Sequence, residues 1–104
     1  MPAGGGFVAV LVIELHFPDA GSLKAKRREL ASIKAQLHGR LGAAVSETAH
    51  QDLWQRATLV ASLTSGSLPR LRAAADELER WVFARCPEGA RVEQLIASVE
   101  DLRQ

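Results

Sequence analysis

The strongest constraint on the fold is a period-two alternation of apolar side chains in FVAVLVIELHF, residues 7–17. Every second residue from Phe7 to Phe17 lies on one face, and the residues from Val8 to His16 lie on the other. Successive side chains of a β-strand point to opposite faces, so this period is typical of a strand. Both faces are apolar over most of the length, and we therefore predict a strand at the centre of a sheet.

Two serines mark the expected starts of two helices. Ser22 and Ser67 each follow strand-breaking residues, and each can accept a hydrogen bond from a free amide of the first helical turn. After each serine the apolar residues recur at helical spacing, which predicts one buried stripe per helix. The stripes are Leu23, Leu30, Ile33, Leu37 and Leu41, and then Leu68, Leu71, Ala75, Leu78 and Val82. Gly42 is expected to end the first helix, and Pro87 with Gly89 the second.

Three further stretches have strand-like sequences, at residues 43–48, 56–65 and 91–102. The order strand, helix, strand, strand, helix, strand predicts an α+β fold, the ferredoxin-like βαββαβ sandwich, with two helices on one face of a four-stranded antiparallel sheet. In that fold the first and third strands are central neighbours. We therefore expect a contact between Glu14 and Arg56 on the face without helices.

Composition agrees with one domain. The chain has 104 residues, 47% of them apolar, which is enough for a compact core without covalent cross-links. We predict a flexible extension at residues 1–6 and a single domain at 7–104. The only cysteine, Cys86, cannot form a disulfide within the chain and has no neighbouring thiol or histidine pair. It is expected to be a half-buried structural thiol, and no metal or cofactor is predicted.

Targeting signals are not evident at the start of the chain. MPAGGG lacks the basic flank of a secretory signal, and the apolar run 7–13 is far shorter than the roughly 20 residues that cross a bilayer. We expect a cytoplasmic protein with no membrane partner.

Positive charge is concentrated in the first helix, although the whole chain carries only +1. Residues 22–41 contain six basic side chains and one acidic one, a net +5. One interpretation is a flank that binds the phosphates of RNA, made by Lys24, Lys26, Arg27, Arg28 and Lys34. The other is a solvated face that keeps the domain soluble. Lys26 is exceptional because its helical angle lies inside the apolar stripe, so its amine must reach past the helix start or meet an acceptor in a neighbouring loop.

The connection HQDLWQ between the second and third strands is richer than a hairpin turn requires. If the connection is a recognition loop, Trp54 would stack on an unpaired base and Arg56 would pair with phosphate. The base edges would be contacted by His50, Gln51 and Asp52. If the connection is purely structural, Asp52 would cap a short turn, and Leu53 and Trp54 would plug the core. Arg56 would then pair with Glu14. The two interpretations are compatible, since a rigid loop presents its polar groups in a fixed geometry.

Two segments resemble the YlxP-like family, small bacterial proteins with a domain of unknown function. The family pattern SLKxKRR is matched by Ser22, Leu23, Lys24, Lys26, Arg27 and Arg28, and VxxxxHQDLWQRA by Val45 and residues 50–57. The likeness extends over nearly the whole chain. It implies a ferredoxin-like domain, usually encoded beside a translation initiation factor and a ribosome-binding factor, and it implies no established substrate, catalytic residue or cofactor.

The sequence offers two further candidates, a group of acid–base residues and an apolar patch. An enzyme would use Glu14, His16, Glu47, His50 and Asp52 as acid–base groups or metal ligands, but no activated nucleophile or phosphate-binding glycine loop accompanies them. On the sheet face without helices, an apolar patch is expected from Val8, Val10, Val12 and Val60, and homodimerisation is its simplest use.

The sequence thus favours a non-enzymatic binding module for ribosomal RNA or a ribosome-assembly intermediate. The alternative is a structural or regulatory homodimer that contacts a protein partner.

Overall fold

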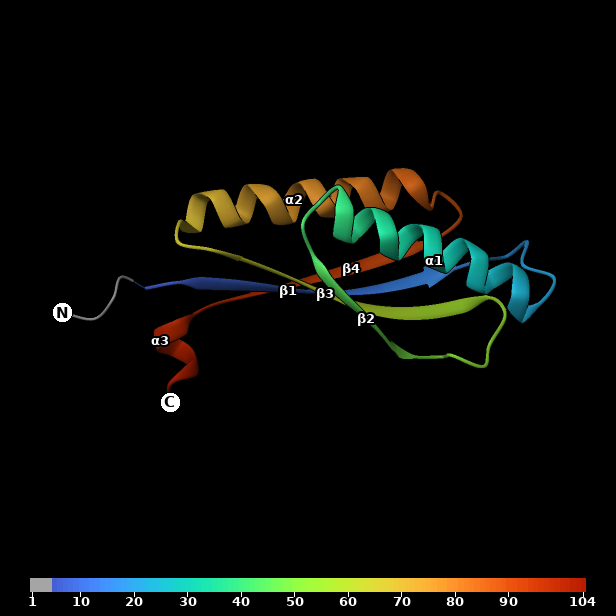
Figure 1. Cartoon of the computed structure of the whole chain (residues 1–104), viewed down its shortest axis with the longest axis horizontal. Helices are drawn as coiled ribbons and strands as arrows, with labels where there is room; N and C mark the ends of the chain where they lie inside the picture. The colour runs from blue at the N-terminus through green and yellow to red at the C-terminus, as the bar shows by residue number, and fades with distance from the viewer. Residues whose placement is uncertain (1–4) are drawn as a thin grey trace.

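A computed structural model describes residues 5–104. The elements follow in the order β1, α1, β2, β3, α2, β4 and α3 (Figure 1). Their bounds are Phe7–His16, Leu23–Gly39, Ala44–Ala49, Arg56–Ser65, Leu68–Arg85, Ala90–Ser98 and Val99–Leu102. Helices α1 and α2 lie side by side over one face of the sheet, and the short α3 lies on the other side of it (Figure 1). The predicted ferredoxin-like α+β fold is confirmed.

The four strands form one antiparallel sheet in the order β2-β3-β1-β4. As predicted, the first and third strands are central neighbours, and Val12 lies opposite Val60 of β3 and Glu93 of β4. The alternation in β1 separates two environments. Ala9, Leu11 and Ile13 are fully buried beneath the helices, whereas the valines between them are only partly buried on the open face.

The core fills the space between the sheet and the two long helices. Leu30, Ile33 and Leu37 of α1 and Leu71, Leu78 and Val82 of α2 are almost completely buried, together with the inward residues of β1 and β3. Both helices begin where the serines predicted, because Ser22 accepts from the amide of Ala25 and Ser67 from that of Arg70. Gly42 adopts a positive φ of 73° just after α1, and its amide donates to the carbonyl of His38.

The end of the chain differs from the prediction. The last strand stops at Ser98 instead of Leu102, and residues 99–102 form α3. Ser98 and Asp101 make a reciprocal capping box, in which each side chain accepts from the other residue's amide. This pair of bonds turns the backbone out of the strand, and the amide of Val99 donates to the carbonyl of Gly6.

Most of the extension expected at residues 1–6 lies outside the residues that the structure describes. Of its last two residues, Gly6 is held by the bond to Val99.

Candidate functional site

The β2–β3 loop, residues 50–55, is a compact turn at one end of the sheet. Its first residue, His50, has a left-handed backbone with φ 64°, and the amide of Leu53 donates to the carbonyl of His50. Just before the loop, β2 contains an extra residue between Glu47 and Ala49 relative to β3. A bulge of this kind bends the strand, and a left-handed residue is uncommon outside glycine, so the loop is held in a specific conformation.

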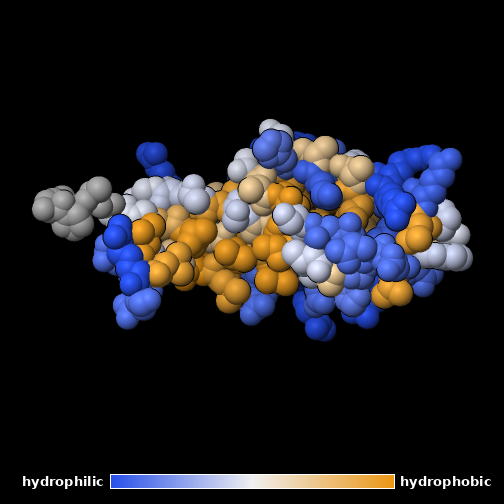
Figure 2. Space-filling model, turned by 60° about the horizontal axis from the view of Figure 1, so that its bottom comes forward, coloured by the Kyte–Doolittle hydropathy of each residue, from blue (hydrophilic) through white to orange (hydrophobic). Residues whose placement is uncertain are grey.

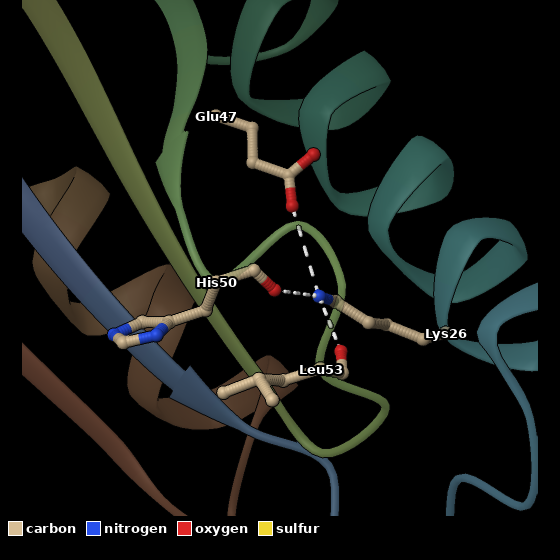
Figure 3. Close-up of polar contacts among 4 residues, drawn as sticks. All are labelled: Lys26, Glu47, His50 and Leu53. Atoms are coloured by element: carbon tan, nitrogen blue, oxygen red, sulfur yellow. Dashed lines mark hydrogen bonds and ion pairs between the residues drawn. The ribbon is translucent and has the colours of Figure 1, made fainter.

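Lys26 of α1 fixes that conformation from beneath (Figure 3). Its side chain is 1% exposed, and its Nζ donates to the carbonyl oxygens of His50 and Leu53, both at 2.6 Å. The carboxylate of Glu47 lies 3.7 Å from the same amine. The expectation that Lys26 meets an acceptor in a neighbouring loop is confirmed. Its assignment as a phosphate-binding residue is wrong, because the amine is buried and is already engaged by two backbone carbonyls and the carboxylate of Glu47.

A second pair of bonds fastens the other end of the loop. The backbone of Gln55 accepts from the amide of Phe17 at 2.8 Å, and its side-chain Nε2 donates to the carbonyl of Pro18 at 3.1 Å. The loop is therefore attached both to α1 and to the segment between β1 and α1. Gln55 was not singled out from the sequence, because nothing local to it indicates a partner 37 residues away.

The braced loop presents its large side chains to solvent. Trp54 is 52% exposed and Leu53 45%, while Gln51 and Asp52 are also exposed and His50 is partly buried. The expectation that Leu53 and Trp54 plug the core is wrong. The loop is anchored by the backbone carbonyls of His50 and Leu53 and by Gln55, and the side chains of Leu53 and Trp54 are left about half exposed.

A shallow depression of about 550 Å³ runs from the loop onto the open face. It is lined by His16, by Arg56 and by residues 52–55. His16 and Arg56 are register partners on the adjacent strands β1 and β3. An aromatic ring, a guanidinium and an imidazole therefore lie together along one surface.

The expected contact between Glu14 and Arg56 does not form. Glu14 lies opposite Thr58 and Arg91, one row away from Arg56, so the two side chains are diagonal neighbours. The ion pairs within residues 5–104 are Lys26 with Glu47, Arg85 with Glu29 and Arg103 with Glu100. Arg56 has no carboxylate partner among these residues, and its charge is available to a ligand.

The basic side chains of α1 are exposed near the same end of the molecule. Lys24, Arg27 and Arg28 flank Lys26, whose amine touches the loop, whereas Lys34 is partly buried. None of them is in an ion pair within the described part of the chain. Glu29 faces α2 through its bond to Arg85, and Arg27 lies about 160° from Glu29 around the helix. Arg27 therefore points away from α2, toward the side where α1 packs on β2.

The acid–base candidates are divided between two faces. Glu47 points to Lys26 beneath the helices, whereas Glu14 and His16 belong to the open face. Within residues 5–104, no three His, Cys, Asp or Glu side chains are grouped so that they could hold one metal ion. The structure does not bring together the five residues considered for an enzyme.

A second pocket, of about 260 Å³, lies between the segment after β1 and the end of α2. Cys86 lines it and is 7% exposed, more buried than predicted. Burial raises the pKa of the Cys86 thiol above its ordinary value of 9.0. At the same place Arg85 donates to Glu29 at 2.6 Å, and this bond raises the pKa of the guanidinium further.

None of the helices within residues 5–104 is both long enough and apolar enough to cross a membrane.

Comparisons with known proteins agree with the fold and the motifs. The family model "Protein of unknown function (DUF503)" matches residues 8–95. The uncharacterized protein YlxP of Bacillus subtilis (strain 168) is 39% identical over 49 residues, which span 47% of this chain and 53% of that protein. The match thus spans about half the length of this curated relative. A de novo designed protein, Foldit4, superposes with a TM-score of 0.55 and 12% identity over 88% of this chain and 96% of that one, a likeness of fold alone. Because the family model covers most of the sequence, this chain belongs to the YlxP-like DUF503 family.

Proposed function

We propose that the protein is a cytoplasmic, non-enzymatic module that binds unpaired RNA through the β2–β3 loop and the basic start of α1. The observation that carries this proposal is Trp54, half exposed on a loop that Lys26 holds rigid. An aromatic side chain that is fixed in place and open to solvent is suited to stacking on an unpaired base.

The neighbours of Trp54 supply the other groups that RNA requires. Arg56 and His16 lie along the same depression, and a guanidinium without an ion-pair partner can bind phosphate. Exposed Asp52 and Gln51 offer an acceptor and an amide to base edges. Stacking, phosphate neutralisation and base-edge contacts are thus available within one surface.

The start of α1 extends this surface with positive charge. Lys24, Arg27 and Arg28 are exposed and lack ion-pair partners within residues 5–104. Lys26 lies between them and supports the loop from below. In this proposal Lys26 binds no phosphate, and it positions the residues that contact RNA.

Replacement of Trp54 by alanine tests the stacking role. A labelled single-stranded RNA oligonucleotide is titrated with protein at low salt, and fluorescence anisotropy gives the dissociation constant. Loss of one stacked base weakens binding by about 1–3 kcal/mol, roughly 5- to 150-fold. Phe83→Ala is the matched control, because Phe83 is a comparably exposed aromatic residue (44%) on α2.

The expected result is weaker binding by Trp54→Ala and unchanged binding by Phe83→Ala. Equal affinities of Trp54→Ala and the wild type for the RNA would show that Trp54 does not stack on a base, and the loop would then have no role in RNA binding. If the wild type does not bind RNA, the proposed function is wrong. Co-sedimentation of the wild type with ribosomal subunits at several salt concentrations then asks whether ribosomal RNA is the target.

A further inference from the structure

We infer that the depression beside the β2–β3 loop selects guanine among the unpaired bases of RNA, and that the carboxylate of Asp52 recognises it. This inference rests on the proposed RNA-binding function and names the base that the same surface accepts. Asp52 is exposed and lines the depression together with Trp54, which follows it by two residues. A base that stacks on Trp54 therefore enters the depression that contains this carboxylate.

The backbone on either side of Asp52 is fixed before any ligand arrives. The amide of Leu53 donates to the carbonyl of His50 at 3.1 Å, which closes the turn that contains Asp52. The amine of Lys26 donates to the carbonyl oxygens of the same two residues (Figure 3). The side chain of Asp52 is short, so its carboxylate stays close to this anchored backbone. A binding group that is already positioned loses less conformational entropy when it binds.

The carboxylate of Asp52 has no structural duty among the described residues. The expectation that Asp52 caps a short turn is wrong, because its carboxylate accepts no hydrogen bond and joins no ion pair within residues 5–104. It is also the one acidic side chain among the described residues that line the depression. A carboxylate repels the phosphates of RNA, so at this surface it favours a ligand group that donates hydrogen bonds.

Guanine is the base whose edge offers two adjacent donors to a carboxylate. Its N1–H and N2–H groups lie side by side, so both oxygens of the carboxylate accept a hydrogen bond. Cytosine and adenine offer an amino group beside a ring nitrogen that is an acceptor, and uracil offers one N–H between two carbonyls. With these bases the second carboxylate oxygen would face another acceptor, and such a mismatch lowers the affinity.

The rest of the depression suits a purine nucleotide. Its volume of about 550 Å³ lies within the range of about 300–1,000 Å³ that is typical of small-molecule sites. The ring of Trp54 can stack on any base, so stacking contributes affinity and the carboxylate of Asp52 contributes the selection. Arg56 lines the same depression, and its guanidinium offsets the negative charge that Asp52 brings near the phosphates.

Oligonucleotides that differ at one base test the selection directly. Each is a short single strand of uridines with a central guanosine, inosine or adenosine, and fluorescence anisotropy at low salt gives the dissociation constant. Inosine differs from guanosine only in lacking the N2 amino group. The wild type is expected to bind the guanosine strand about 10-fold more tightly than the inosine strand, the usual effect of one hydrogen bond to a charged group. The adenosine strand should bind at least as weakly as the inosine strand.

Asp52→Asn tests whether this carboxylate makes the selection. The amide keeps the size of the side chain but places a donor opposite one of the two donors of guanine. The guanosine and inosine strands should therefore bind to Asp52→Asn within about twofold of each other. Asp76→Asn is the matched control, because it makes the same change at an exposed residue of α2, and it should keep the wild-type preference. Thermal unfolding of both variants shows that each is folded.

The results that would overturn guanine selection differ from those that would overturn RNA binding. Equal affinities of the wild type for the three strands would leave the RNA-binding function in place and contradict the selection. A preference that persists in Asp52→Asn, or that is lost in folded Asp76→Asn, would show that another group recognises the base. Binding of none of the strands would overturn the proposed function as well. The comparison of guanosine with inosine uses the wild type alone, so its result stands whatever the stability of Asp52→Asn.

Discussion

At the scale of single residues, Lys26 connects the sequence to the candidate site. Its helical angle predicts burial, and a buried amine requires acceptors, so a partner in a neighbouring loop could be anticipated from the sequence. The identity of the acceptors could not, because they are the backbone carbonyls of His50 and Leu53. The exposure of Trp54 could not be predicted from the sequence either, because an aromatic residue in a loop has the same local pattern whether it plugs the core or faces solvent.

Removal of the Lys26 amine should destabilise the fold. Lys26→Met retains an apolar stem but leaves the carbonyl of Leu53 without this donor and Glu47 without its cationic neighbour. The free energy of unfolding is expected to fall by about 3 kcal/mol, the usual effect of breaking a buried charged contact. Chemical denaturation measures it, with Lys24→Met as the control. Lys24 is exposed, and its substitution should change stability by less than about 0.5 kcal/mol.

If the two variants are equally stable, Lys26 does not brace the loop.

At the scale of elements, the sequence predicted both ends of five of the six elements other than α3 to within a few residues. Alternating or helical spacing of apolar residues is a strong signal over ten or more positions, as in β1 and α2. The prediction was wrong at the C-terminal end, because it continued the last strand to Leu102, whereas β4 ends at Ser98. The pair Ser98 and Asp101 has the spacing of a capping box, and this short signal determines where β4 stops.

Acid should unravel α3 before the rest of the fold. Hydrogen bonds from Ser98 lower the pKa of Asp101 below its ordinary value of 3.8. Because the folded pKa is the lower one, the stabilisation by this carboxylate is present above pH 3.8 and is lost as the pH falls through the folded pKa. Amide hydrogen exchange read by NMR should show loss of protection at Ser98 in that range. Asp101→Asn should remove the transition, and an unchanged acid transition in that variant would contradict the account.

At the scale of the whole molecule, the polar groups of the proposed RNA surface and the apolar residues Val8, Val10 and Leu95 lie toward opposite ends of the sheet. The β2–β3 loop and the start of α1 lie at one end (Figure 1), whereas hydrophobic surface gathers toward the other (Figure 2). Arg56 lines the depression beside the loop.

The central claim is that exposed basic residues beside the braced loop bind the phosphates of RNA, and the salt dependence of binding tests it most directly. The slope of log K against log salt changes by about 0.7 for each phosphate contact with a single strand. The triple variant Lys24→Ala, Arg27→Ala and Arg28→Ala should therefore have a slope shallower than the wild type by about 2. The matched triple on α2, with Arg70, Arg72 and Arg80 replaced by alanine, should retain the wild-type slope. Equal slopes for the wild type and the α1 variant, or binding that is insensitive to salt, would contradict the account.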